Sequence, residues 1–517
     1  MISVALVFSS AFFSVPGNWD VLSYHLPRVL YYLQYGSFAD FPTAYWAQIS
    51  HPQLGPTWLI FVMMTVGFRE NFFFLPQFLG WIVSALAIFG ICGHFNDRLS
   101  PTGTRGFVRG WLVFILALFP LMEMLGASTE RNDILVLAYS AAAFFFLFSE
   151  QRQAGIWGAV AMALALAVKA TALPLVPIWI FFYFFRRPIK FSQIFIGLVI
   201  AFLIVADSGY GKNFLRFGNA FGPSGVMHQH SLRSFSEIVH QGGKNIFRYA
   251  IDSGTPDGWP GLNSAERLVS MWRESGIEAG KSLFGTDLGK GELYGEFSGG
   301  RSSLAHEDPV YYGLAYLLLA LFAAVVFFIR EKNRRELVLW FLPALLLYVI
   351  HSFTLRYDPW HGRFFMVNGI FLVPLLARGL DLAWQKRTLK NCCLALLFLL
   401  FVQNIYSIIL RNNQRLFQKG ARLELALRNR PEFLPIFQKL ERTVPEQAVL
   451  AIRIPEDLPE YLLFGPRLNR IVISAFDFSL GPLKTPPNAG WLFFHSSLGE
   501  VEAGDEALGQ GFFLRKL

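Results

Sequence analysis

Two aspartates between apolar runs are the first residues that suggest chemistry. Asp20 follows the first apolar run and lies beside Trp19 and Tyr24. A carboxylate in such a boundary setting is expected to have a raised pKa and to act as a general base. Asp133 ends the polar sequence Ser128–Asp133 between two further apolar runs. The alternative for both acids is helix capping, which fits Asp133 better than Asp20 when each is taken alone.

One lysine interrupts an apolar region of the chain. Lys169 lies between Leu164–Val168 and Ala170–Pro174. A cation in such a position costs ~2.5–3.5 kcal/mol on membrane insertion and normally faces a cavity or a partner. A phosphate group would be a suitable partner. The alternative is a lysine that extends its ammonium group to the membrane interface.

A second group of polar and aromatic side chains lies between residues 356 and 363. Arg356, Tyr357, Trp360, His361 and Arg363 follow one another closely there. Arginine binds phosphate through two parallel hydrogen bonds, and aromatic rings stack on sugar faces. Trp360 and His361 are therefore candidates for substrate binding, and Arg363 for phosphate binding. The alternative is an aromatic belt at the membrane surface, anchored by arginines.

The first polar segment supplies further candidates. We predict substrate binding by Tyr24, His25 and His51, and phosphate binding by Arg28. A separate group of residues contains the side-chain types of a metal site, but its spacing matches no established metal signature. The sequence therefore identifies no metal ligand, and a divalent metal cofactor stays an alternative. These residues are His228, His230, His306, Glu307 and Asp308.

Composition indicates that a membrane protein positions these residues. Of the 517 residues, 54% are hydrophobic and 16% are charged, and the mean hydropathy is +0.41. Soluble proteins have about 25% charged residues. The net charge of +9 is typical of basic cytoplasmic loops, so we expect no nucleic-acid partner. The three cysteines all lie in apolar runs and match neither a zinc site nor a disulfide framework.

Apolar runs predict a polytopic α-helical protein with about 11 membrane-spanning helices, uncertain by one or two. The run 54–68 is expected to lie at the membrane surface. The first run, Met1–Val15, is expected to be a membrane helix rather than a cleaved signal peptide, and its natural start could lie upstream. The predicted spans are 2–15, 72–93, 110–126, 134–149, 154–168, 171–185, 191–207, 313–329, 337–352, 364–384 and 391–410.

Charge predicts the orientation of these spans. Basic loops follow the spans that end near Arg98, Arg186, Arg330 and Lys386, and basic loops face the cytoplasm. The other loops then share the outer side, which brings the candidate residues to one face of the membrane. These outer segments are 16–71, 127–133, 208–312, 353–363 and the tail from 411.

The chain divides into two predicted domains. Residues 1–410 form the membrane domain, and residues 411–517 form a small α/β domain on the outer face. In this tail, β-rich runs at 448–454, 470–474 and 491–495 alternate with helical stretches. The long segment 208–312 is rich in Gly, Ser and His, which predicts an irregular lid over the acceptor rather than a domain.

Several short stretches together resemble the GT-C glycosyltransferases. The resemblance is to the branch of the protein O-mannosyltransferases and the lipid A aminoarabinose transferase, and in particular to the bacterial dolichyl-phosphate-mannose-protein mannosyltransferase-like group. Each stretch is weakly specific, but their order and shared side carry the resemblance. They are Trp19–Arg28, Asn132–Asp133, Lys169–Ala172, Phe217–Pro223, His306–Asp308, Pro359–Arg363 and Phe464–Leu468.

This resemblance implies a GT-C catalytic domain in residues 1–410 and a polyprenyl-phosphate sugar donor. Asp20 matches the first-loop acid proposed as the base, and Asp133 a second-loop acid that supports the site. Lys169 is similar in placement to a basic residue near the donor phosphate. Some relatives carry paired acids for a metal, but Val21 and Leu22 follow Asp20 here, so metal dependence is open.

The predicted function is inverting transfer of a sugar to an acceptor hydroxyl on a protein, lipid or polysaccharide. Asp20 would take the acceptor proton, while Lys169 with Arg28 or Arg363 would neutralise the leaving phosphate. The expected location is the periplasmic face of a bacterial inner membrane. The alternatives are a transporter or flippase of a lipid-linked glycan, a membrane scaffold, and transfer of a non-sugar group; no repeat typical of a transporter is visible.

Overall fold

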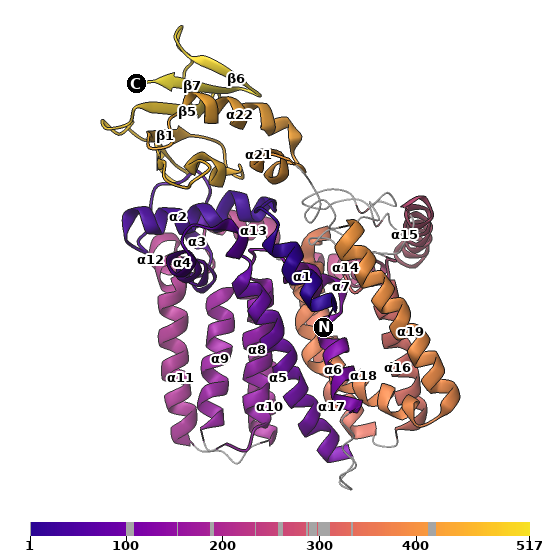
Figure 1. The fold of residues 1–517 in the computed structure, drawn as a ribbon. Helices are drawn as coiled ribbons and strands as arrows, with labels where there is room; N and C mark the ends of the chain where they lie inside the picture. The colour runs from indigo at the N-terminus through magenta and orange to yellow at the C-terminus, as the bar shows by residue number, and fades with distance from the viewer. Residues whose placement is uncertain are drawn as a thin grey trace.

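A computed structural model shows a helical bundle with a small α/β domain at one end (Figure 1). The structure describes residues 2–99, 108–151, 153–186, 191–232, 234–256, 262–285, 288, 297, 311–331, 334–411 and 420–517. The first domain is helical throughout its described part. The second, from residue 420, carries the strands.

In the described part of the chain, ten helices run along the bundle, and each contains most of one predicted apolar span. The predicted span 110–126 is broken, because Pro120 separates the long helix α6 from the short helix α7 (Leu121–Gly126). The bundle helices are α5 (Leu75–Leu99), α6 (Val108–Leu118), α8 (Asp133–Phe148), α9 (Ala154–Val168), α10 (Leu175–Arg186), α11 (Phe191–Val205), α16 (Leu314–Arg330), α17 (Arg334–Thr354), α18 (Gly369–Trp384) and α19 (Arg387–Tyr406).

Four helices of the described chain are long and apolar enough to cross a membrane. They cover Glu70–Phe95, Phe195–Phe217, Pro359–Trp384 and Arg387–Ile409. Seven further apolar helices have 10–17 residues, among them the N-terminal α1 (Ile2–Phe12). The number of crossings therefore stays a prediction.

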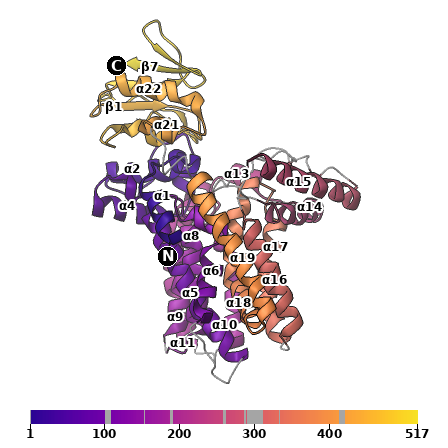
Figure 2. The same ribbon diagram turned by 45° about the vertical axis from the view of Figure 1, so that its right-hand side comes forward.

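The two ends of the bundle carry different elements. α5, α10, α16 and α18 all end on the side away from the α/β domain, where the basic loops begin (Figures 1 and 2). The opposite end carries short helices that lie across the bundle, which fits the surface position expected for residues 54–68. These are α2 (Leu26–Tyr35), α3 (Ala47–Ser50) and α4 (Leu54–Val66).

The long segment 208–312 is largely helical in its described part, so the predicted irregular lid is wrong there. α14 has a Ser234 N-cap whose side chain accepts a hydrogen bond from the Glu237 backbone N–H. α14 and α15 are amphipathic, and this periodicity outweighs their glycine content. The helices are α12 (Gly211–Phe217), α13 (Ser224–His230), α14 (Phe235–Ser253) and α15 (Leu262–Phe284).

The C-terminal domain contains a mixed five-stranded sheet in the order β2-β1-β5-β7-β6. β1 pairs in parallel with β2 and β5, whereas β7 pairs antiparallel with β5 and β6. The three predicted strand regions are present as β1, β2 and β5. Its elements are α21 (Arg422–Ala426), α22 (Leu434–Thr443), β1 (Val449–Arg453), β2 (Ile471–Ser474), β3 (Phe476–Asp477), β4 (Gly481–Pro482), β5 (Trp491–His495), β6 (Glu506–Gly509) and β7 (Phe512–Lys516), with 3-10 turns η7 (Pro431–Phe433) and η8 (Glu460–Phe464).

Side chains of the first outer segment hold the two domains together. The Gln34 amide of α2 donates to the Val472 carbonyl and accepts from the Val472 N–H, so it pairs with the outer edge of β2. Arg422 donates two hydrogen bonds to the Glu70 carboxylate, at distances down to 2.7 Å. The C-terminal domain is thus bonded directly to the loops at the bundle end.

Candidate active site

Asp20 lies at the start of the short π-helical segment η1 (Val21–His25). Its carboxylate makes no capping hydrogen bond, so capping does not explain this residue. Instead, Asp20 Oδ2 accepts a hydrogen bond from Arg363 Nη1 at 3.0 Å, although the two residues are 343 positions apart. The Asp20 side chain is 29% exposed, which leaves it accessible from the outer end.

Asp133 and Lys169 form a second ion pair. Asp133 is the first residue of α8, and Lys169 directly follows the end of α9, so both lie at the same end of two packed helices. Lys169 Nζ lies 2.6 Å from Asp133 Oδ1. Neither Asn132 nor Asp133 makes a capping bond through its side chain. Lys169 therefore faces a buried partner rather than the membrane interface.

Arg363 connects the two ion pairs. It lies in the 3-10 segment η5 (Pro359–Asn368), which begins where the Asp358 carboxylate accepts from the Trp360 N–H. While Nη1 contacts Asp20, Arg363 Nε is 3.7 Å from Asp133 Oδ2. The ring of Phe364 lies beneath both cations, 4.8 Å from Lys169 Nζ and 5.7 Å from the Arg363 guanidinium carbon.

Arg131 is a further member that our sequence interpretation did not select. It is buried, and with Asp133, Arg363 and Thr129 it lines a cavity of about 10 Å³, room for roughly one water molecule. The sequence signal that could have identified Arg131 is its position, two residues before Asp133 in a short turn on the predicted outer side. We call Asp20, Arg131, Asp133, Lys169 and Arg363 the charged cluster.

The charged cluster combines three cations with two carboxylates and so has a formal excess of one positive charge. Burial favours the neutral form of Asp20, but the nearby charges of Arg363 and Arg131 outweigh it and hold the pKa of Asp20 well below its usual range. The raised pKa expected from sequence is therefore wrong. Its cause is Arg363, which the sequence places far from Asp20.

Three of the candidate substrate-binding residues form an aromatic group beside Asp20. The ring of Tyr24 lies 4.3 Å from that of His25 and 5.2 Å from that of His51. Trp46 extends this group, at 5.4 Å from His51. Burial lowers the pKa of both His25 and His51 to about 3, so both imidazoles are neutral at physiological pH.

Arg28 has a different environment from the other cations. It is buried, and it donates to the hydroxyl of Tyr32 and to the backbone carbonyls of His51 and Pro52. These contacts hold the turn that carries His51. Within the described residues no hydrogen bond or ion pair joins Arg28 to the charged cluster, so phosphate binding by Arg28 stays a prediction.

Residues 356–361, which lead into η5, include both buried and partly exposed side chains. Arg356 pairs with Glu237 at 2.9 Å, and Tyr357 is buried. His361 Nδ1 is 2.7 Å from the hydroxyl of Tyr249 in α14. Trp360 is the candidate with an outward face, at 39% exposure.

A divalent metal does not fit the charged cluster as it stands, because both carboxylates are paired with cationic side chains. No group of three or more metal-binding side chains occurs among the described residues. Of the residues named above as a metal alternative, His306, Glu307 and Asp308 lie outside the described residues, as does the side chain of His228.

Similarity to solved structures identifies the fold that carries this arrangement. No protein-family model and no curated sequence matches the chain. It resembles ArnT from Cupriavidus metallidurans bound to undecaprenyl phosphate, with TM-score 0.55 and 11% identity over 99% of this chain and 96% of that one.

Two further solved structures are similar at lower scores. ArnT in the apo state has a TM-score of 0.46 and 12% identity, over 99% of this chain and 96% of that one. An Archaeoglobus fulgidus oligosaccharyltransferase has a TM-score of 0.43 and 13% identity, over 93% of this chain and 65% of that one. The resemblance expected from the sequence is thus confirmed at the level of the fold: over nearly its whole length, the chain has the fold of this ArnT structure.

Proposed function

We propose that this protein transfers a sugar from a polyprenyl-phosphate donor to an acceptor hydroxyl at the outer face of a bacterial inner membrane. The observation that carries the proposal is the charged cluster, in which three cations surround two carboxylates at the outer end of the bundle. An excess positive charge in a partly buried site is complementary to a phosphate group.

The fold adds support for the donor class. The ArnT structure with TM-score 0.55 is bound to undecaprenyl phosphate. A polyprenyl chain would lie between the apolar helices while its phosphate reached Lys169 and Arg363. Arg363 contacts both acids through a planar guanidinium, so it is suited to hold a phosphate through two hydrogen bonds.

The reaction is a direct displacement with inversion at the anomeric carbon. The acceptor oxygen forms the new bond to C1 while the bond from C1 to the phosphate oxygen breaks and its electron pair leaves with the phosphate. Asp20 takes the acceptor proton, and Lys169 and Arg363 stabilise the charge on the leaving phosphate. Asp133 keeps Lys169 in place.

Donor binding would also activate Asp20. In the structure Arg363 is shared between Asp20 and Asp133, which makes Asp20 a weak base. A bound phosphate competes for the Arg363 guanidinium, and a weaker pairing to Asp20 raises the basicity of its carboxylate. The neutral His25 and His51, with Tyr24 and Trp360, then provide uncharged surfaces for sugar and acceptor.

The test is donor turnover by the purified protein in lipid nanodiscs. A panel of polyprenyl-phosphate sugars with envelope extract is supplied, and released polyprenyl phosphate is measured by mass spectrometry. We expect release from at least one donor, and a loss of about 10³-fold in Asp20→Asn. The matched control is Asp40→Asn, an outer-segment acid paired with Arg216 at 3.0 Å, which should stay within about threefold.

The same samples distinguish the transporter alternative. A flippase moves the donor between leaflets of a vesicle without releasing polyprenyl phosphate. Movement without release, or full release by Asp20→Asn, would contradict the proposal.

A further inference from the structure

The C-terminal domain makes a buried polar contact with the segment that carries Asp20. Glu460 of η8 is 4% exposed. Its Oε1 accepts from the hydroxyl of Tyr31 in α2 at 2.5 Å, and its Oε2 accepts from Gln48 Nε2 at 2.6 Å. Both donors belong to the first outer segment, so among the described residues this carboxyl of one domain is hydrogen-bonded by side chains of the other.

Gln48 connects Glu460 to the backbone near Asp20 through a second hydrogen bond. Its Nε2 donates to Glu460 and also to the carbonyl of Ser23, at 2.9 Å. Its Oε1 accepts from the Thr43 hydroxyl at 2.8 Å, so the amide orientation is defined. Ser23 is three residues from Asp20 and lies in the π-helical segment that Asp20 begins. A chain of two hydrogen bonds therefore runs from Glu460 to the backbone of η1.

A second contact from the same domain reaches the residue before Asp20. The ring of Trp19 lies 5.6 Å from that of Phe433, and the guanidinium of Arg430 lies 4.8 Å above the Trp19 ring. Asp457 is also near, because Trp19, Asp20 and Ser23 each influence the pKa of its carboxyl. The C-terminal domain thus contacts the chain on both sides of Asp20.

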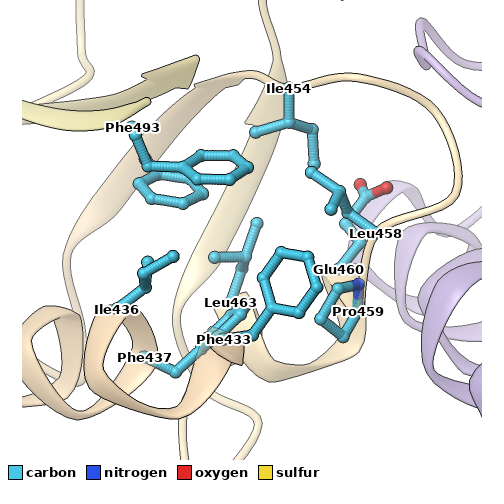
Figure 3. A pocket seen from close by; sticks show the side chains of 10 residues that line it. Phe433, Ile436, Phe437, Ile454, Leu458, Pro459, Glu460, Leu463 and Phe493 are labelled. Carbon is cyan, nitrogen blue, oxygen red and sulfur yellow. The ribbon is translucent and has the colours of Figure 1, made fainter. Parts of the chain in front are cut away.

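Figure 3 shows Glu460 at the rim of an otherwise apolar cavity, next to the ribbon of the first outer segment. The cavity has a volume of about 10 Å³ and is lined by residues such as Phe433, Ile436 and Phe493. It is too small for a ligand. Its apolar wall instead isolates the Glu460 carboxyl from water, which strengthens the hydrogen bonds to Tyr31 and Gln48.

We propose that the C-terminal domain positions the catalytic segment, with Glu460 as a positioning residue that holds η1 through Gln48. This inference rests on the proposed function of Asp20 as the base, and it assigns a role to the C-terminal domain. Because Asp20 lies in the first turn of this helical stretch, where a π-helical segment precedes α2, its placement depends on contacts with the neighbouring chain as well as on the helix. A displacement of about 1 Å in a catalytic group costs on the order of 100-fold in rate.

The experiment compares Glu460→Ala, Gln48→Ala and Glu460→Gln in nanodiscs. We expect the two alanine variants to lose about 30- to 100-fold in kcat, with KM for the donor within threefold of wild type. Glu460→Gln should restore kcat to within threefold, because its amide can accept from Gln48 and donate to Tyr31. The control is Glu70→Gln, which weakens the same domain contact through Arg422 and Tyr461 without touching η1; it should stay within threefold.

Hydrogen exchange of the backbone amides of residues 20–26 is measured in the same samples without any donor. We expect exchange at least tenfold faster than in wild type in the two alanine variants. Glu70→Gln should exchange at the wild-type rate. This readout does not require turnover, so it tests the positioning role even if no donor is processed by wild type. Unchanged exchange in both alanine variants, or an equal loss of kcat in Glu70→Gln, would overturn the proposal.

Discussion

Lys169 Nζ lies 2.6 Å from Asp133 Oδ1, and the pair joins the start of α8 to the end of α9. Both side chains are largely buried. Such a pair is costly to break because the remaining charge is left in an environment of low polarity. The ammonium group of Lys169 therefore both stabilises this end of the bundle and supplies positive charge for a substrate.

This link predicts the behaviour of Lys169→Met. The variant keeps the length of the side chain but leaves Asp133 unpaired, so we expect a loss of about 3 kcal/mol in stability and at least 100-fold in turnover. The double variant Lys169→Met with Asp133→Asn removes both charges. It should recover most of the apparent melting temperature but not the activity. Recovery of activity in the double variant would exclude a direct role for the lysine charge.

Arg363→Lys tests whether the planar guanidinium is needed. Lysine is a point charge and cannot contact Asp20 and Asp133 together as Arg363 does. We expect kcat/KM to fall by about 10- to 100-fold while the protein stays folded. The control in the same loop is Arg356→Lys, whose partner is Glu237, and it should remain within about twofold. Equal effects of the two substitutions would argue against a special role of Arg363.

The buried carboxyl of Glu460 should make a pH-dependent contribution to the stability of the fold. Burial raises the pKa of Glu460 to about 7, and the groups facing it are Tyr31, Tyr35 and Gln48. Because the folded state holds the proton more tightly than the unfolded state, this contribution is complete below about pH 4.5 and is lost as the pH rises through 7. Relative to Glu460→Gln, the free energy of unfolding of wild type should fall by up to about 3 kcal/mol over that range. Melting curves of both proteins between pH 4.5 and 8 measure this difference, and parallel curves would refute it.

Orientation in the membrane gives a further prediction. In a variant without native cysteines, Gly504→Cys lies on the exposed surface of the C-terminal domain, and Lys386→Cys lies at the opposite end of the bundle. A maleimide that does not cross membranes should label Gly504→Cys in intact cells. Lys386→Cys should react only after the cells are permeabilised. The reverse pattern would place the charged cluster on the cytoplasmic side.

Helices were the most predictable part of this protein. Each apolar run of the sequence corresponds to a helix, and α9 matches its predicted range 154–168 at both ends. Apolar runs are reliable because a chain in lipid must satisfy its backbone hydrogen bonds within the helix. Pro120 divides one predicted span because local backbone chemistry overrides hydropathy there.

The sequence predicts which residues belong to the candidate site better than it predicts the contacts between them. Shared sidedness and the family resemblance together predict a site of Asp20, Asp133, Lys169 and Arg28 or Arg363. The structure brings Arg363 into contact with the two acids and Asp133 into contact with Lys169. The lowered pKa of Asp20 could not be predicted, since it depends on a guanidinium 343 residues away. Tertiary distances of this kind have no local signal in a single sequence.

The C-terminal strands show the same limit. β1, β2 and β5 are apolar and were predicted, whereas β6 and β7 contain Glu506, Gly509 and Arg515 and lack a clear alternation. Their pairing is set by β5, which supplies the partner edge for β7. Strands that depend on a neighbour for their hydrogen bonds are recognised poorly from composition.

The bond between Gln34 and Val472 has a consequence for how this protein behaves among its neighbours. β2 is one of the two edge strands of the sheet, and an open edge is a template on which another chain can add a strand. The Gln34 amide occupies the N–H and carbonyl of Val472 that such a strand would need. Docking of the C-terminal domain therefore also hinders strand addition at β2, and a molecule whose domain has detached would expose this edge to pairing with another chain.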